Sequence, residues 1–203
     1  MTIFYRLGKN LYANITNNCP CACVFCIRNV TDSVGDAPSL WLEREPTLSE
    51  ILIAYDSRQD LLEVDEVVFC GYGEPMTRAH DVIHIARYIR NNRLPSMSSS
   101  PKVRLNTNGL VNFLCPGFDM KELAVFDSIS VSLNADDAKE YDRLCKPCFG
   151  VGSFDAVVDF AKEARAYCNV VFTVMENLGA ARIANCQVLA DKINVPLRVR
   201  GYM

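Results

Sequence analysis

Short apolar runs rich in β-branched residues alternate along the chain with longer stretches whose apolar side chains recur at helical spacing. Strict alternation of strand and helix is typical of parallel strands joined by right-handed crossovers. About six such units are present, whereas a closed barrel needs eight. The pattern therefore predicts an α/β fold, an open, partial TIM-like barrel of about six βα units. The predicted strands are residues 11–16, 66–70, 103–105, 128–133, 170–175 and 197–201, and the predicted helices are residues 48–55, 79–90, 120–125, 154–167 and 181–192.

The length and composition of the chain suit one domain. Its 203 residues are 50% hydrophobic, which is enough to bury a core. The sequence contains no internal repeat and no low-complexity linker. We therefore expect a single domain over residues 1–203, with the turn-rich segment 94–101 as a surface loop.

The charge and the cysteine content bear on location and partners. A formal net charge of -3 argues against nonspecific binding to nucleic acid or anionic membranes, because both need a basic surface. No apolar run reaches about 18 residues, and the N-terminal residues lack a signal-peptide pattern. Ten cysteines indicate metal ligands and buried thiols in a reducing compartment. We expect a cytoplasmic protein without membrane contact.

A cysteine triplet follows the first predicted strand. Cys19, Cys23 and Cys26 have Cys-x-x-x-Cys-x-x-Cys spacing, and Cys21 lies inside the triplet. Three thiolates suit three irons of a 4Fe–4S cube, which leaves the fourth iron open for a small chelating ligand. Closely spaced thiolates are also typical of zinc knuckles and of electron-carrier ferredoxins. On the triplet alone, these alternatives stay open.

The second predicted strand is followed directly by Gly71, Tyr72, Gly73 and Glu74. Chemistry in a βα barrel lies at the carboxyl ends of the strands, so such segments are candidate binding elements. Two glycines allow the backbone to approach a ligand closely, and Glu74 or the exposed carbonyls can accept hydrogen bonds from an ammonium group. By itself, a Gly-x-Gly segment is usually only a turn.

Polar side chains mark the ends of the third and fourth predicted strands. Period-two alternation places Asn106 and Asn108 on one face, and likewise Ser130, Ser132 and Asn134. We expect both polar faces to point into the barrel. The alternative is ordinary turn chemistry at the strand ends, to which Asn is well suited.

The last predicted strand carries two arginines on one face, Arg198 and Arg200. An arginine in this position suits a cofactor carboxylate or a substrate anion. The alternative is that both residues simply end a frayed strand.

Together, the triplet and the residue Phe25 before its last cysteine resemble the signature of the radical S-adenosylmethionine (radical SAM) enzymes. The resemblance implies a radical SAM core that holds a 4Fe–4S cluster on Cys19, Cys23 and Cys26. It also implies that S-adenosylmethionine chelates the open iron through its amino and carboxylate groups. The reduced cluster would then cleave this cofactor to methionine and a 5'-deoxyadenosyl radical.

The other strand ends extend the resemblance. Residues 71–74 resemble the Gly-Gly-Glu element of the family, which binds the amino group of the cofactor, although Tyr72 replaces the middle glycine. Similar Thr-Asn-Gly and Val-Ser-Leu-Asn strand ends contact the methionine and ribose parts of the cofactor in the family. The predicted cofactor contacts are Phe25, Gly71, Tyr72, Gly73, Glu74, Asn106, Asn108, Ser132, Asn134, Arg198 and Arg200.

Within the superfamily, the segments YRLGKNLYANITNNCPCACVFCIRN and VVFCGYGEP look like those of the small TatD-associated group. That resemblance implies no substrate. The resemblance to the superfamily implies an enzyme that takes an electron from a flavodoxin or ferredoxin-like donor and abstracts hydrogen from an unidentified substrate. This substrate is either a small molecule or a macromolecule. The alternatives are an activase that installs a radical on a partner protein and a non-enzymatic iron-sulfur protein.

Three further cysteines suggest a second metal or cluster, namely Cys115 with the Cys-x-x-Cys pair Cys145 and Cys148. We favour the simpler interpretation, since a second cluster normally needs four ligands.

The remaining candidates also have simpler interpretations. His80 and His84 share a helix face, as metal ligands would, but a solvated pair is the favoured interpretation. Cys70 ends a buried strand, where we expect a packed thiol, although a substrate role at the barrel mouth stays open.

Overall fold

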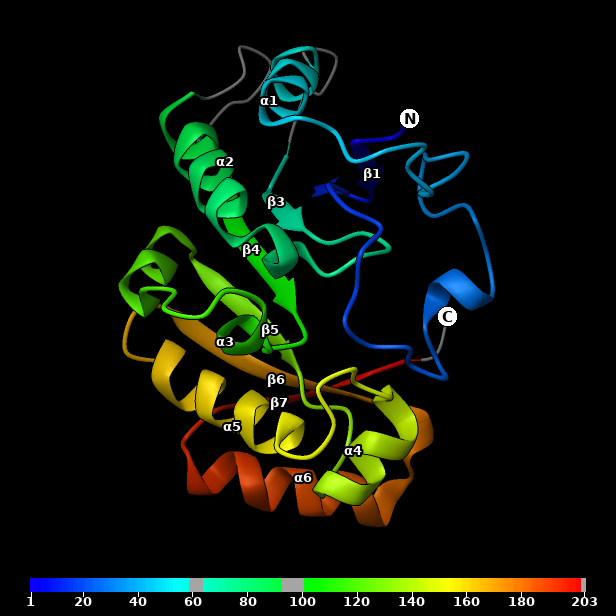
Figure 1. Cartoon of the computed structure of the whole chain (residues 1–203), viewed down its shortest axis with the longest axis vertical. Helices are drawn as coiled ribbons and strands as arrows, with labels where there is room; N and C mark the ends of the chain where they lie inside the picture. The colour runs from blue at the N-terminus through cyan, green and yellow to red at the C-terminus, as the bar shows by residue number, and fades with distance from the viewer. Residues whose placement is uncertain (59–63, 93–100, 202–203) are drawn as a thin grey trace.

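The computed structural model describes residues 1–58, 64–92 and 101–201. Its core is one seven-stranded sheet in the order β1-β2-β3-β4-β5-β6-β7 (Figure 1). Only β1 runs antiparallel to its neighbour β2, and all later pairs are parallel. Within the described ranges, β1 and β7 are not paired, so the predicted open α/β barrel is confirmed. The strands are β1 Phe4–Leu7, β2 Asn10–Ala13, β3 Glu66–Phe69, β4 Lys102–Thr107, β5 Ser128–Ser132, β6 Asn169–Met175 and β7 Leu197–Arg200.

Helices connect the parallel strands and cover one side of the curved sheet (Figure 1). In α2, apolar residues at helical spacing face the core, and all of Val82, Ile85, Ala86 and Ile89 are fully buried. No helix in the described part of the chain is long and apolar enough to cross a membrane. The helices are α1 Leu48–Asp56, α2 Ala79–Asn91, α3 Val111–Leu114, α4 Ala138–Cys145, α5 Ser153–Ala164 and α6 Ala180–Lys192, and the 3-10 helices are η1 Ile27–Asn29, η2 Pro75–Arg78, η3 Met120–Val125 and η4 Glu176–Leu178.

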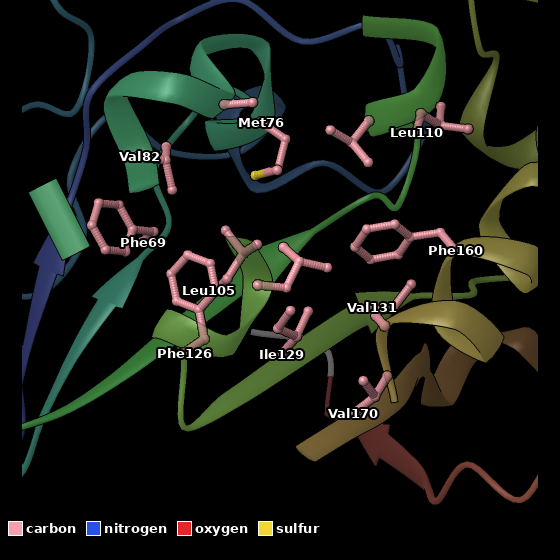
Figure 2. Close-up of a cluster of buried hydrophobic side chains, with 14 of the residues drawn as sticks. Phe69, Met76, Val82, Leu105, Leu110, Phe126, Ile129, Val131, Phe160 and Val170 are labelled. Carbon is pink, nitrogen blue, oxygen red and sulfur yellow. The ribbon is translucent and has the colours of Figure 1, made fainter. Parts of the chain in front are cut away.

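The apolar face of the sheet packs against these helices. Figure 2 shows Leu105, Ile129 and Val131 from neighbouring strands beside Met76 and Phe160 from the helical layer. All five side chains are fully buried. Burial of a side chain of this size contributes about 1.5–3 kcal/mol. Because strand side chains alternate between faces, this packing turns the polar residues of β4 and β5 toward the other side of the sheet.

Some elements differ from the sequence predictions. β1 was not predicted, and it forms a hairpin with β2 around Gly8, whose φ of 62° suits glycine. Residues 120–125 form a 3-10 helix rather than an α-helix. α4 was not predicted because its exposed face is highly charged, and Asp137 caps its start by accepting a hydrogen bond from the Glu140 amide. The predicted loop at 94–101 lies outside the described residues except for residue 101.

Candidate active site

A cavity of about 550 Å³ lies on the polar side of the sheet. Loops that follow β2, β3, β4 and β5 line it, and so does β7. The structure therefore gathers residues that are far apart in sequence, as expected for the carboxyl ends of parallel strands. Every residue predicted as a cluster ligand or a cofactor contact lines this cavity: Cys19, Cys23, Cys26, Phe25, Gly71, Tyr72, Gly73, Glu74, Asn106, Asn108, Ser132, Asn134, Arg198 and Arg200.

The cysteine loop is held in place by the end of α4. The Ala22 amide donates a 3.0 Å hydrogen bond to the Cys145 carbonyl, and the Val24 amide donates one of 2.9 Å to the Leu144 carbonyl. These backbone bonds fix the loop between the first and last cysteines of the triplet. Sequence analysis missed this contact, because α4 comes much later in the chain and carries no recognisable partner motif.

Hydrogen bonding between thiols sets their protonation. The pKa of Cys23 is lowered to about 4, mainly by a hydrogen bond from Cys145 and then by one from Cys21. The pKa of Cys19 is lowered as well, mainly by a hydrogen bond from Cys21, whereas burial raises the pKa of Cys26. The pKa of Cys21 and that of Cys145 are both raised, because their protons are held in these bonds. The pKa values of two of the three triplet thiols are thus shifted toward the thiolate, which is the form that ligates metals.

The Glu74 side chain is buried, and its carboxylate is bound by other groups of the protein. Its side chain is 5% exposed, and it accepts hydrogen bonds from the Thr107 hydroxyl (2.7 Å), the Asn108 amide (2.7 Å) and the Met76 amide (3.0 Å). Burial raises its pKa to about 7. The sequence predicted Glu74 or the exposed backbone carbonyls as acceptors for an ammonium ligand, and most of the accepting capacity of Glu74 joins the ends of β3 and β4.

The two glycines allow close packing within the protein. A Cβ atom on Gly71 would lie 2.1 Å from the Asn14 side-chain oxygen, and one on Gly73 would lie 2.4 Å from the Thr16 carbonyl oxygen. The Gly73 amide also donates a 3.0 Å hydrogen bond to that carbonyl. The glycines therefore let the end of β3 pack against the backbone that leads into the cysteine loop, and the close approach of this backbone to a ligand stays a prediction.

Tyr72, which replaces the middle glycine of the family element, contacts the segment of residues 31–41. Its side chain is buried, its hydroxyl donates a hydrogen bond to the Thr31 carbonyl, and its ring meets Trp41 edge-on at 5.0 Å between centroids. Ala37 and Leu40 complete this small apolar cluster. These contacts with Tyr72 hold the segment between η1 and α1 beside the cavity.

Two asparagine amides at the ends of β4 and β5 face sulfur atoms. The Asn108 side-chain nitrogen lies 3.9 Å from the Cys21 sulfur, and the Asn134 side-chain nitrogen lies 3.7 Å from the Cys145 sulfur. The backbone of Asn134 is left-handed, with a φ of 59°. Ser132 lines the cavity between them along β5, while Ser130 is buried and accepts a hydrogen bond from Arg198 at 3.3 Å. The predicted alternation of β5 thus places its polar face toward the cavity.

A family comparison decides the class of this site. The model of the Radical SAM superfamily matches residues 13–177, which include the cysteine triplet and strands β3 to β6. The chain belongs to the radical SAM superfamily. As a radical SAM enzyme, it uses S-adenosylmethionine and a 4Fe–4S cluster as cofactors.

Solved structures share the fold of this radical SAM chain. One is TYW1 with a lysine-pyruvate adduct bound, at 16% identity and a TM-score of 0.64, covering 96% of this chain and 65% of that one. Another is native anSMEcpe with bound AdoMet, at 14% identity and a TM-score of 0.60, covering 95% of this chain and 50% of that one. The chain therefore spans between half and two thirds of the length of these proteins. No curated protein sequence matches it.

The donor set suits the radical SAM cluster. Each thiolate ligand of a 4Fe–4S cluster binds a different iron, so the ligands need not converge on one point. Within the ranges that the structure describes, no three His, Cys, Asp or Glu side chains converge closely enough to hold a single metal ion. Three partly buried thiols that share one cavity fit a multi-iron cluster better than a zinc knuckle.

The other candidate metal ligands are not gathered into a second centre. Cys145 is buried against the cysteine loop, Cys148 is exposed, and the Cys115 sulfur lies 3.5 Å from the Nε2 atom of His80. No group of three described residues joins them. His84 does not line the cavity. The structure therefore gives no support to a second cluster or to a metal site on the two histidines.

Arg104 lines the cavity but was not singled out from the sequence. It lies on the same face of β4 as Asn106, so period-two alternation could have identified it. Its guanidinium pairs with Glu66 at 2.8 Å. Cys70 also lines the cavity, and burial raises its pKa.

Proposed function

We propose that the chain is a radical SAM enzyme of the small TatD-associated group, with its cluster on Cys19, Cys23 and Cys26. The observation that carries this proposal is that the three thiols share one cavity with the polar ends of β3, β4 and β5. The group assignment rests on the segments around the triplet and around residues 71–74. It names no substrate, and residues 1–203 are proposed to form one domain.

The cluster, when bound, supplies the electron that splits S-adenosylmethionine into methionine and a 5'-deoxyadenosyl radical. The role of the chain is to bind and orient the cofactor. The backbone carbonyls of residues 71–73 suit the amino group of the methionine part, because Glu74 is largely committed to protein partners. The amides of Asn108 and Asn134 and the hydroxyl of Ser132 offer neutral hydrogen bonds along the cavity.

Exclusion of water is the second task of the chain. Tyr72 holds the segment of residues 31–41 beside the cavity, and Leu40 and Phe25 add apolar surface to its lining. A dry site protects a reactive radical from side reactions. The expected electron donor is a flavodoxin or ferredoxin-like protein, and ten free cysteines suit the reducing cytoplasm.

The test is an anaerobic assay of cofactor cleavage. Protein reconstituted with iron and sulfide is reduced with dithionite, mixed with S-adenosylmethionine and analysed for 5'-deoxyadenosine. We expect the nucleoside from wild type and from a matched Cys168→Ala control, whose thiol lies outside the cavity. Cys23→Ala should form none above background. Wild type that carries a full cluster, binds no S-adenosylmethionine and forms no nucleoside would instead be an iron-sulfur carrier.

A further inference from the structure

Three arginines meet on one side of the cavity. Arg104 comes from β4, and Arg198 and Arg200 come from β7, and all three line the same space. Arg198 is close enough to Arg104 and Arg200 for their positive charges to lower its pKa, after the larger effect of burial. A different arginine, Arg28, lowers the pKa of the triplet thiol Cys23. The arginine cluster, defined as Arg104, Arg198 and Arg200, is therefore separate from the cysteine loop.

The arginine cluster is short of negative charge. Arg104 pairs with Glu66 at 2.8 Å, whereas Arg198 donates a 3.3 Å hydrogen bond to the neutral Ser130 hydroxyl. Among the ion pairs of the described residues, Arg200 has no acidic partner. Glu66 pairs with Arg104, and the Glu74 carboxylate of the same cavity is bound by Thr107, Asn108 and Met76, so neither forms an ion pair with Arg198 or Arg200. Such a site concentrates anions, since a bound anion removes the repulsion between the cations.

The surroundings of the cluster suit a small organic anion. Tyr12 lines the cavity next to the arginines and stacks on Tyr5, with 5.1 Å between ring centroids. Cys70 lines the same cavity as the three arginines. Guanidinium groups bind carboxylate and phosphate through paired hydrogen bonds, and an aromatic wall adds apolar contact area.

We propose that Arg104, Arg198 and Arg200 form a substrate subsite that binds a carboxylate or phosphate group. This proposal rests on the proposed function, since it places the substrate in the cavity that also takes the cofactor. The substrate is thus an anion whose charged group binds the arginines, and the rest of the molecule occupies the cavity that the triplet thiols also line.

The test measures anion binding by isothermal titration calorimetry on the reconstituted holoenzyme with saturating S-adenosylmethionine. Inorganic phosphate and succinate are the two probes, and the tighter one identifies the charged group. We expect wild type to bind at least one probe. Arg198→Gln and Arg200→Gln should each weaken that binding about tenfold, because each loses a charge-assisted hydrogen bond. Arg200 is exposed, so its variant is not expected to disturb folding.

Arg87→Gln is the matched control, since Arg87 lies on α2 and pairs with Glu122 outside the cavity. It should bind the probes as wild type does. The proposal is overturned if neither probe binds wild type, or if both arginine variants bind as tightly as wild type. It is also overturned if S-adenosylmethionine displaces the probe, because the arginines then hold the cofactor carboxylate. Anion binding without 5'-deoxyadenosine formation would refute the proposed function and leave the anion subsite standing.

Discussion

The Thr107 hydroxyl donates a 2.7 Å hydrogen bond to the Glu74 carboxylate, and this bond ties the end of β4 to the end of β3. The Asn108 amide donates to the second carboxylate oxygen at the same distance. A buried carboxylate with several donors keeps two candidate cofactor-binding loops in a fixed arrangement. Burial disfavours the charged form of this carboxylate and raises the pKa of Glu74 to about 7.

This raised pKa makes stability depend on pH. Glu74 holds its proton more tightly in the folded protein than in the unfolded chain, so the free energy of unfolding falls as the pH rises from 4.5 to about 7. The fall contributed by Glu74 is about 3 kcal/mol at most. Urea denaturation of the cluster-free protein at several pH values should show this fall in wild type. Glu74→Gln should lack it, whereas Glu163→Gln, an exposed control, should keep it. Equal pH dependence in wild type and Glu74→Gln would contradict the assignment.

Gly73→Ala should destabilise the protein. The new Cβ atom would lie 2.4 Å and 2.6 Å from the carbonyl oxygens of Thr16 and Asn18, and backbone atoms cannot give way as a flexible side chain can. We expect a loss of about 2 kcal/mol or more in urea denaturation, together with lower iron content after reconstitution. Gly201→Ala is the control, because the nearest atom to its Cβ is 4.0 Å away. A stable, fully loaded Gly73→Ala variant would show that the cysteine loop tolerates displacement.

Tyr72→Gly restores the glycine of the Gly-Gly-Glu element but should not improve the protein. The substitution removes a buried ring that contacts Trp41, so we expect a loss of about 3 kcal/mol and a red-shifted emission of this single tryptophan. Tyr72→Phe removes only the hydrogen bond to Thr31 and should lose about 1 kcal/mol. Unchanged tryptophan emission in Tyr72→Gly would mean that the ring does not anchor the segment.

The iron content distinguishes one cluster from two. We expect the variant with Cys115, Cys145 and Cys148 all changed to alanine to bind as much iron per chain as wild type, about four atoms. Cys26→Ala should lose most of this iron. Colorimetric iron analysis and the absorbance of the reconstituted proteins provide the measurement. A drop from about eight to about four atoms in the triple variant would instead reveal a second cluster.

The fold was predictable because its signals are local. Period-two and helical spacing identified β3 to β7 and most of the long helices within a few residues, and the spacing of Cys19, Cys23 and Cys26 singled out the loop after β2. β1 is as short as β3 and β7, but its sequence FYRL has no period-two alternation, so its pattern did not distinguish it from a loop. Residues 120–125 were predicted as an α-helix and form the 3-10 helix η3, because apolar spacing over only six residues does not separate the two kinds of helix.

The details of the site depend on contacts between distant segments. Sequence could place Glu74 at a strand end, but not show that Thr107 and Asn108 would occupy its oxygens. It could not show that Arg104 and Arg198 meet, because the register of β4 and β7 is set by the strands between them. Residue spacing thus predicts which residues reach the cavity, and tertiary packing decides their partners.

The junction between the cysteine loop and the end of α4 bears on the order of events during biosynthesis. Cys21 and Pro147 form an antiparallel bridge, and the Cys148 amide donates a 2.8 Å hydrogen bond to the Pro20 carbonyl. The thiols are translated early, but the backbone that holds them leaves the ribosome only after most of the sheet. We therefore expect the cluster to be inserted only after residues 138–148 have been synthesised and have packed against the cysteine loop, so that iron-sulfur assembly factors meet a folded site.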